Sequence, residues 1–453
     1  MRVASSCIQY EPETGPIWHL VSLREARVKP VAVKAAMMLF AMVTGGCSDL
    51  TTVKAPDVLE PPALATSGGA EALRVGAING FVLAFAGDAR GQITISGALA
   101  DEFFNAAATV IGLAEADQRI MPDPSSAYPY ALVHRARLDA KRAIQAMQAY
   151  APASRSKIGE LFALKAYSEL FLAENMCSGI PLGELVDGNP VYGRPVLSDE
   201  LYAQTLLDFD SASVYAADST RILSLARVGR GRTLLGAGKF AAAAAAVAAV
   251  PTSYSYVTFH SAAAQPNGVF SIINNLKFIT VANREGGNGL DFRTAQDPRV
   301  PTVLVGKGVD GTTDVYGFAT YSSLAASIVL ASGTEARLIE AELALRTADV
   351  SGAFAILNAL RTTKAGLAPL TPDSTASGRV DQLFRERAFW MFATGHRHGD
   401  LRRLIRQYGR TVESVFPSGP YKAGQMYGAE VTFAPDAQQL ANPGYIGCTS
   451  RAP

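Results

Sequence analysis

The chain has 453 residues, of which 49% are hydrophobic and 18% are charged. This composition supports a large buried core and excludes wholesale disorder. The 41 basic and 40 acidic residues leave a formal net charge of +1, so the sequence has no electrostatic footprint for nucleic acid. Its 20 Phe and 16 Tyr provide ample aromatic surface for stacking a ligand.

The N-terminal segment has the pattern of a secretory signal. Lys29 and Lys34 precede an apolar run at 35–43, which is followed by three small residues and Cys47. The run is about half of the roughly 20 residues that a transmembrane helix requires. A Cys directly after small residues is similar to a bacterial lipobox. We therefore predict a signal peptide at 1–46 and a lipid on Cys47; a core helix that ends at a chance Cys is the alternative.

The segments around this signal set the predicted domain organisation. Residues 1–28 place acidic residues upstream of the basic flank, and we interpret them as an extension of the reading frame. Residues 47–65 contain three Pro and few large apolar side chains, which predicts an extended tether. Residues 66–453 are expected to form one domain, held to a membrane only by its lipid.

The body of the chain is predicted to be mainly α-helical. Ala163, Ala166, Tyr167 and Leu170 occupy positions i, i+3, i+4 and i+7, which is one apolar face of a helix. Ser198 is a candidate N-cap, followed by two acidic residues in the first turn. In chain order, we expect helices at 72–85, 130–150, 154–176, 198–217, 221–235, 239–250, 334–346, 351–361 and from about 380 onward.

Neighbouring helices are predicted to pair as tetratricopeptide-like hairpins. Gly236 and Gly238 lie in the turn between two of them, and the Ala run at 241–246 allows close approach. No clean period of 34 residues is visible, so the units must be degenerate. The last long helix is expected to carry one apolar face made by Phe384, Ala388, Met391 and Phe392.

The stretch 252–330 differs from the rest of the body. It is rich in Gly, Asn, Thr and Tyr, with short β-like runs at 255–260 and 277–281. We predict an irregular lobe inserted between helix pairs. Loops on a rigid helical scaffold are where binding residues usually lie.

The sequence lacks the standard motifs of catalysis and cofactor binding. The run 236–241 formally matches G-x-G-x-x-A, but a predicted helix precedes it where a dinucleotide site needs a strand. There is no phosphate-binding loop, no H-E-x-x-H, no C-x-x-C and no G-x-S-x-G. We therefore predict no catalytic residue and no cofactor.

Two clusters of titratable residues have structural interpretations. His396 and His398 with Asp400 could suggest a metal, but residues two apart on a helix point away from each other. With only five His in the chain, a hydrogen-bonding role is favoured over a metal site. Asp101 and Glu102 are expected to be a solvated or capping pair rather than an acid–base pair.

The four Cys divide into two groups. One lies in the leader and one is the predicted lipid site. Cys177 and Cys448 remain, an even pair in an exported protein, where disulfides persist. We hypothesise that they are bridged and fasten the C-terminal tail to the helix at 154–176; two separate buried thiols are the alternative.

Several blocks of the sequence together resemble the SusD/RagB-like proteins. The specific C-terminal block begins R-E-R-A-F-W-M-F and ends G-H-R-H-G-D-L-R-R. Each block is weak alone, but their order spans nearly the whole mature chain. They lie at 47–57, 95–104, 169–181, 297–300, 335–342, 385–403 and 442–445.

The resemblance implies a fold and a function. Members are mostly helical, with four tetratricopeptide-like helix pairs that support a variable lobe. They are lipid-anchored on the outer face of the outer membrane, where they cap a SusC-like TonB-dependent transporter. They pass it oligosaccharides or, in some members, peptides, and they bind without catalysis.

The resemblance also suggests ligand contacts. The segment that matches a family contact region supplies Asp101, Phe103, Phe104 and Asn105, and the irregular lobe adds Tyr316, Phe318 and Tyr321. Aromatic faces stack on sugar rings, while Asn and Asp hold hydroxyls. A core role is the alternative for these Phe. Family ligand sites often contain Trp, whereas the only Trp after the predicted signal is Trp390, in the C-terminal helix.

Two further function classes stay open. A helical-repeat scaffold lipoprotein in envelope assembly would bind partners but no small molecule. A surface hydrolase would need a nucleophile or metal motif that the sequence lacks. The acidic residues Glu386 and Asp400, among several Arg, are predicted to form buried ion pairs that lock the last helix.

Overall fold

The computed structural model describes residues 64–87, 90–107, 111–121, 129–186, 189–435 and 441–453. All of them belong to one compact unit. The predicted signal peptide, the lipid site at Cys47 and nearly all of the tether lie outside the described residues.

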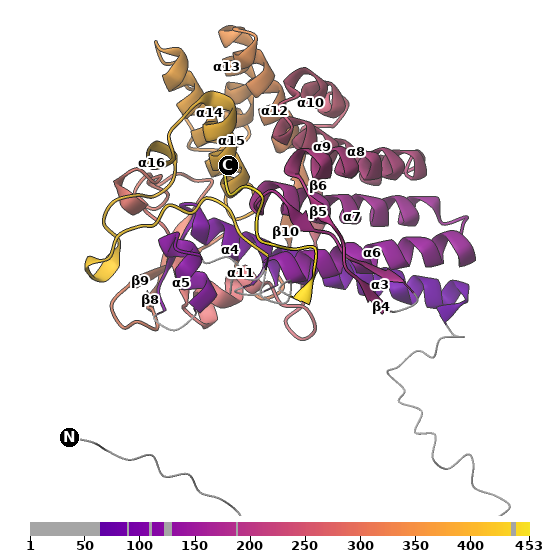
Figure 1. Ribbon diagram of the computed structural model, residues 1–453. Helices are drawn as coiled ribbons and strands as arrows, with labels where there is room; N and C mark the ends of the chain where they lie inside the picture. The colour runs from indigo at the N-terminus through magenta and orange to yellow at the C-terminus, as the bar shows by residue number, and fades with distance from the viewer. Residues whose placement is uncertain (1–63, 88–89, 108–110, 122–128, 187–188, 436–440) are drawn as a thin grey trace, which may run out of the picture. The chain divides into compact units, whose positions relative to one another are not determined.

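Antiparallel helices packed side by side form the scaffold, as Figure 1 shows for the helices α3, α6, α7, α8 and α9. Each of these helices contacts the next one in the stack, which then continues into a second group of helices. The mainly helical, hairpin-based fold class is thereby confirmed. The helices are α3 (Ser67–Ala86), α6 (Pro129–Tyr150), α7 (Arg155–Asn175), α8 (Ser198–Tyr215), α9 (Thr220–Gly236), α10 (Phe240–Val247), α12 (Gly333–Arg346) and α13 (Val350–Thr362).

Helix α7 is the centre of this stack, and it is buried on nearly every side. A helix surrounded by others needs close approach on several faces. On its α9 side, Gly229 allows that approach, since a Cβ there would lie 2.2 Å from the ring of Phe209 and 2.9 Å from that of Tyr167. The sequence places small residues where neighbouring helices meet.

Helix α3 is long and apolar enough to cross a membrane by length and composition alone. A core helix passes the same test, and α3 packs as one. Its Phe81 and Phe85 stack on Phe171 of α7, with ring centroids 6.1 Å and 5.5 Å away. These contacts account for the aromatic residues on its buried face, while Val75 and Leu83 remain exposed.

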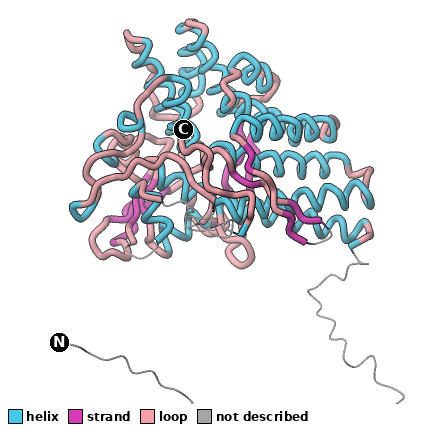
Figure 2. Tube along the Cα trace, in the orientation of Figure 1, coloured by secondary structure: helices cyan, strands magenta, loops and turns pink. Residues whose placement is uncertain are grey.

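The lobe between α10 and α12 is built from short strands and turns (Figure 2). Strands β6 and β10 pair antiparallel, as do β8 and β9. Strand β7 of the lobe pairs antiparallel with β1, which comes much earlier in the chain. The elements are β1 (Phe103–Asn105), β6 (Ser255–Thr258), α11 (Gly268–Phe270), η1 (Ser271–Asn275), β7 (Ile279–Val281), η2 (Glu285–Gly287), β8 (Thr302–Lys307), β9 (Asp314–Phe318) and β10 (Ile328–Ser332).

Shorter elements connect the scaffold and the tail. Two small antiparallel strand pairs, β2 with β5 and β3 with β4, lie between α7 and α8. The shorter elements are α4 (Gln92–Leu99), α5 (Ile111–Gln118), β2 (Ile180–Pro181), β3 (Glu184–Val186), β4 (Asn189–Val191), β5 (Pro195–Val196), α16 (Val412–Val415) and η3 (Lys422–Gly424).

The last long helix is divided in two, which corrects the sequence prediction. Helix α14 (Ala376–Trp390) stops, and α15 (Arg397–Tyr408) begins after a turn. Ala393 and Gly395 adopt left-handed backbone conformations in that turn, which no helix can contain. Met391 and Phe392 therefore lie outside the helix, although both stay buried as the apolar pattern indicates.

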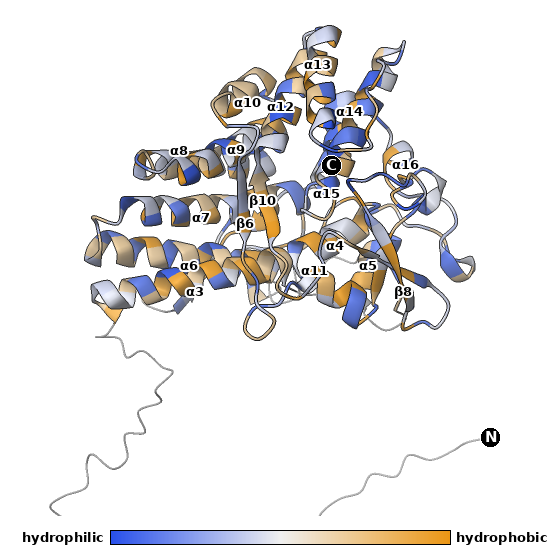
Figure 3. Ribbon diagram, turned by 180° about the vertical axis from the view of Figure 1, so that it is seen from behind, coloured by the Kyte–Doolittle hydropathy of each residue, from blue (hydrophilic) through white to orange (hydrophobic). Residues whose placement is uncertain are grey.

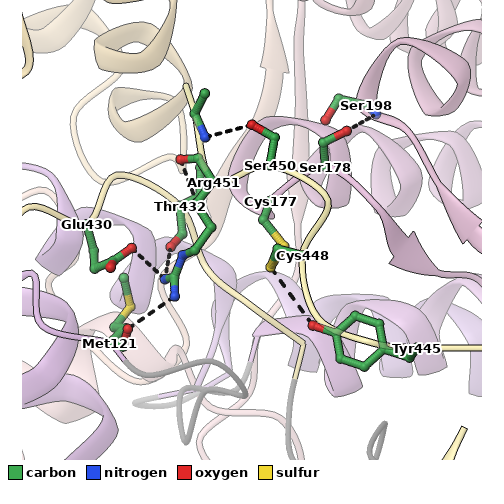
Figure 4. The surroundings of a disulfide bond; sticks show 11 residues. Met121, Cys177, Ser178, Ser198, Glu430, Thr432, Tyr445, Cys448, Ser450 and Arg451 are labelled. Atoms are coloured by element: carbon green, nitrogen blue, oxygen red, sulfur yellow. Dashed lines mark hydrogen bonds and ion pairs between the residues drawn. A yellow bond between two sulfur atoms is a disulfide. The ribbon is translucent and has the colours of Figure 1, made fainter.

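A disulfide joins Cys177 to Cys448, as the sequence hypothesis holds (Figure 4). It fastens the C-terminal tail beside the end of α7. Backbone hydrogen bonds flank it, from Cys177 N to Phe433 O at 2.8 Å and from Thr449 N to Ser178 O at 2.9 Å. The tail is thus held by both a covalent bond and strand-like pairing.

Candidate ligand-binding site

A cavity of about 430 Å³ lies where the lobe meets the helical scaffold. Figure 3 shows β6 and β10, which form part of its wall, between the helix stack and α15. The cavity is lined by Thr252, Ser253, Tyr254, Ser255, Arg299, Phe318, Thr320, Tyr321, Ser327, Val329, Leu330, Ala331, Ser332, Thr334, Glu335, Lys364, Phe389, Trp390, Met391, Phe392, Thr394 and His396. A volume of this size accommodates a small ligand.

Aromatic side chains from three segments line the cavity. Phe318 packs edge-to-face against Tyr321 and Phe392, with ring centroids 5.0 Å apart in both pairs. Tyr321 donates its hydroxyl to Ala393 O at 2.8 Å, so its ring is held in place. Trp390, at the end of α14, is half-buried and accessible to a ligand in the cavity.

Trp390 also carries an unused polar group. Its Nε1 is buried and makes no hydrogen bond to any described residue. The guanidinium of Arg299 lies over the Trp390 ring, 5.1 Å from the centroid. Arg299 is itself held by Asp297 at 2.7 Å and Glu386 at 2.7 Å. The Trp ring is therefore supported from one side by a fixed cation.

A buried polar cluster adjoins the cavity on the side of α12. Glu335, in the first turn of α12, is only 1% exposed. His396 follows α14 and lies with Nε2 3.1 Å from Glu335 Oε1. Behind it, Arg232 of α9 binds Glu174 of α7 through two nitrogens, at 2.8 Å and 2.6 Å. The cluster connects the cavity to the centre of the helix stack.

The sequence-predicted contacts fall in different places. Phe318 and Tyr321 line the cavity, as a ligand site requires. Asp101, Phe103 and Asn105 are at most 1% exposed, which contradicts their assignment as ligand contacts. Each has an internal partner instead: Arg397 for Asp101, the ring of Phe392 for Phe103, and the backbone of Ala107 for Asn105.

Phe104 and Tyr316 lie outside the cavity lining. Phe104 packs against Tyr421, with ring centroids 5.7 Å apart, and the Lys422 ammonium lies 5.0 Å from its ring centroid. Tyr316 is covered by Arg293, whose guanidinium lies 4.4 Å from the ring centroid. Both aromatic rings are already stacked against protein groups. The seven predicted residues therefore do not form one site.

Of the two titratable clusters, the Asp101–Glu102 pair differs from expectation. Asp101 and Glu102 are fully buried, so the prediction of a solvated or capping pair is wrong. Burial raises the pKa of Glu102 to about 8, against the hydrogen bond that it accepts from Ala393 N. His398 contacts the side chain of Asn175 and the backbone oxygen of Val431. Within the described residues, no cluster of metal-ligating side chains is found.

Sequence reasoning missed Trp390 and Glu335 as cavity residues. Trp390 stands out only as the sole Trp after the predicted signal, in a segment interpreted as a structural helix. Glu335 belongs to the motif Ser332-Gly-Thr-Glu335, which normally indicates a helix-capping box and nothing more. Their signals are local, whereas the cavity depends on long-range packing.

Comparisons with known proteins identify the fold. A SusD superfamily protein from Bacteroides thetaiotaomicron superimposes with a TM-score of 0.65 at 14% identity, covering 84% of this chain and 99% of that one. A laminarin-binding SusD-like protein gives 0.63 at 14% identity, over 85% and 99%. Surface glycan-binding protein A from Bacteroides uniformis gives 0.63 at 13% identity, over 84% and 99%.

The chain therefore has the SusD-like fold over most of its length. This confirms the structural side of the sequence resemblance. No protein-family model and no curated protein sequence matches the chain. The likeness lies in the arrangement of the elements, since the sequence identities are low.

Proposed function

We propose that this protein is a surface lipoprotein of the outer membrane that binds an oligosaccharide in the aromatic cavity. It carries its lipid on Cys47 and delivers the sugar to a SusC-like TonB-dependent transporter. It binds without catalysis. The observation that carries the proposal is the cavity lined by Trp390, Phe318 and Tyr321 in a chain with the SusD-like fold.

The chemistry of the cavity suits a sugar. Aromatic faces bind the C–H faces of a pyranose ring, and a few polar groups then fix its hydroxyls. Ser and Thr residues on and beside β6 and β10 are also among the lining residues and supply such groups. Two of the structural relatives are named for glycan binding, one for binding laminarin and one as a surface glycan-binding protein.

A variant with a single tryptophan provides a direct assay. The full-length chain with Trp18→Phe retains Trp390 as its only Trp, so its fluorescence reports on the cavity. We expect saturable quenching or a spectral shift on titration with laminarin oligosaccharides or with another member of a neutral glycan panel. Chromatography of the sugars after incubation should recover them intact.

Matched variants locate the binding. Trp390→Ala, followed by calorimetry, should weaken binding by at least about tenfold, since stacking and area are both lost. Ser327→Arg places a bulky side chain at an exposed lining position and should block entry without disturbing the core. Phe104→Ala removes an aromatic ring outside the cavity and should leave the affinity unchanged. Binding that survives both cavity variants would disprove this site.

The transporter partnership has its own test. Affinity purification of the lipidated protein from detergent-solubilised outer membranes should recover a TonB-dependent β-barrel protein in stoichiometric amount. Cys47→Ala should move the protein out of the membrane fraction. Recovery of the unmodified protein from the soluble fraction would contradict the anchoring proposal.

A further inference from the structure

Glu335 is a buried carboxylate of the cavity that lacks a hydrogen bond. Its side chain is 2% exposed, and neither oxygen accepts a hydrogen bond from any described residue. A buried charged group in this state costs free energy unless another molecule supplies the donor. Glu335 is among the residues that line the cavity, so a ligand group that inserts beside its buried oxygens can supply that donor.

The usual structural role of such a Glu is not used here. In the capping box, the N-cap hydroxyl accepts from the backbone N–H of the Glu, and the Glu side chain returns a bond to the N-cap N–H. The first half is present, from Glu335 N to Ser332 Oγ at 3.1 Å. The second half is absent, because the Glu335 oxygens have no partner among the described residues. Ser332 instead pairs with Ser255 in the β6–β10 ladder.

His396 does not supply the missing donor either. Its Nε2 lies 2.8 Å from Arg232 Nη1, and a guanidinium can only donate. We therefore assign the Nε2 lone pair to Arg232 and the ring proton to Nδ1, which faces Thr394 Oγ1 at 2.8 Å. The approach of Nε2 to Glu335 Oε1 at 3.1 Å then brings two acceptors together.

The cations near Glu335 have other partners. Arg232 is held by the two oxygens of Glu174, and it donates no hydrogen bond to Glu335. Arg299, also in the lining, is engaged by Asp297 and Glu386. Lys364, the remaining cation of the lining, is exposed. The buried end of the cavity therefore offers a negative charge to a ligand.

We propose that the cavity prefers oligosaccharides with a free primary amino group, whose ammonium binds Glu335. A hydroxyl group would donate one hydrogen bond and leave the charge uncompensated. An ammonium group supplies up to three donors and the opposite charge, and the adjacent aromatic rings favour a cation as well. The inference rests on the proposed sugar-binding function of the same cavity and specifies its ligand class.

Three β-1,4-linked sugars that differ at one substituent test the inference. Glucosamine tetramer carries the amine, N-acetylglucosamine tetramer blocks it, and cellotetraose replaces it by hydroxyl. At pH 6, we expect calorimetry to give at least about tenfold tighter binding of the amine, which is the range of a charged hydrogen bond. Glu335→Gln should abolish this preference and leave the two neutral sugars unaffected. Glu340→Gln, an identical change on α12 outside the cavity lining, should preserve it.

The outcomes separate the two proposals. If neutral sugars bind and the amine has no advantage, or if Glu335→Gln keeps the advantage, the inference is wrong and the sugar-binding function stands. If no sugar of any class binds, the proposed function fails as well. Thermal unfolding provides a second readout, because the amine sugar should raise the melting temperature of the parent protein more than that of Glu335→Gln. Equal stabilisation by sodium or calcium chloride alone would show a simple cation site and overturn the inference.

Discussion

Arg397 donates hydrogen bonds to both carboxylate oxygens of Asp101, although 296 positions separate the two residues. Both side chains are buried, and Asp101 Oδ2 also accepts from Leu290 N of the lobe at 2.8 Å. One carboxylate thus joins the N-terminal part of the domain, the lobe and the C-terminal helix α15. Such a pair locks the arrangement more than it adds net stability.

Breaking that pair should be costly. Arg397→Ala leaves Asp101 buried and unpaired, and we expect the free energy of unfolding to fall by about 3–5 kcal/mol. Denaturant unfolding measures the change. Arg410→Ala is the control, since its partner Asp381 is largely exposed and surface pairs contribute about 0–1 kcal/mol. If Arg397→Ala lowers the free energy of unfolding no more than the control does, Asp101 has found another partner and the prediction is wrong.

Stability should fall as the pH rises from about 5 to 8 through the titration of Glu102. Burial raises the pKa of Glu102 from 4.5 to about 8. Between these values the folded protein holds a proton that the unfolded chain releases, so unfolding becomes easier as pH increases. The limiting slope for one group is about 1.4 kcal/mol per pH unit.

Glu102→Gln isolates this effect. Burial also raises the pKa of Asp117, to about 7, so this residue lowers stability over the same pH range. The contribution of Glu102 is therefore the difference in pH dependence between the parent and the variant. Gln keeps a carbonyl acceptor for Ala393 N and cannot ionise. Denaturant unfolding of both proteins from pH 5 to 8 should show that the free energy of unfolding falls more steeply with pH in the parent than in Glu102→Gln. The same pH dependence in both proteins would refute the assignment.

The disulfide should stabilise the fold through the long loop that it closes. Cys177 and Cys448 are separated by 271 residues, for which the chain-entropy model gives up to about 5 kcal/mol. We expect Cys448→Ser to lower the melting temperature and to expose the C-terminal tail to proteases. Mass spectrometry of the released fragments would locate the first cut. Resistance of the tail to cleavage would show that the backbone pairing around Ser178 and Phe433 is sufficient.

Two glycines in the helix stack should respond oppositely to Ala. Gly229→Ala forces a methyl group against the Phe209 ring, and we expect a loss of about 1–3 kcal/mol from overpacking. Gly76→Ala lies on the exposed side of α3 with nothing within 4 Å, so it should gain about 0.5–1 kcal/mol from reduced backbone entropy. Denaturant midpoints of the two variants give the comparison, and a shift in the same direction for both would contradict the packing argument.

The helices were predictable because apolar spacing is a local signal, and the disulfide was predictable because few Cys were left to pair. The apolar spacing of Ala163 to Leu170 predicts α7 on its own, and only two Cys remained to pair in a chain predicted to be exported. The break after Trp390 was not predictable. The apolar pattern continues through Met391 and Phe392, and the left-handed turn at Ala393 depends on contacts such as Glu102 with its backbone N–H.

Periodicity along the sequence specified the helices of this protein, composition indicated the irregular lobe, and the resemblance to SusD/RagB-like proteins suggested the candidate aromatic residues. Tertiary structure alone decided which aromatic residues face the cavity: Phe318 and Tyr321 line it, whereas Phe103 packs against Phe392 in the core. It also decided that Asp101 is occupied by Arg397 while Glu335 is left without a donor. The physical reason is that helix formation depends on neighbours a few residues away, whereas burial and pairing depend on residues hundreds of positions distant.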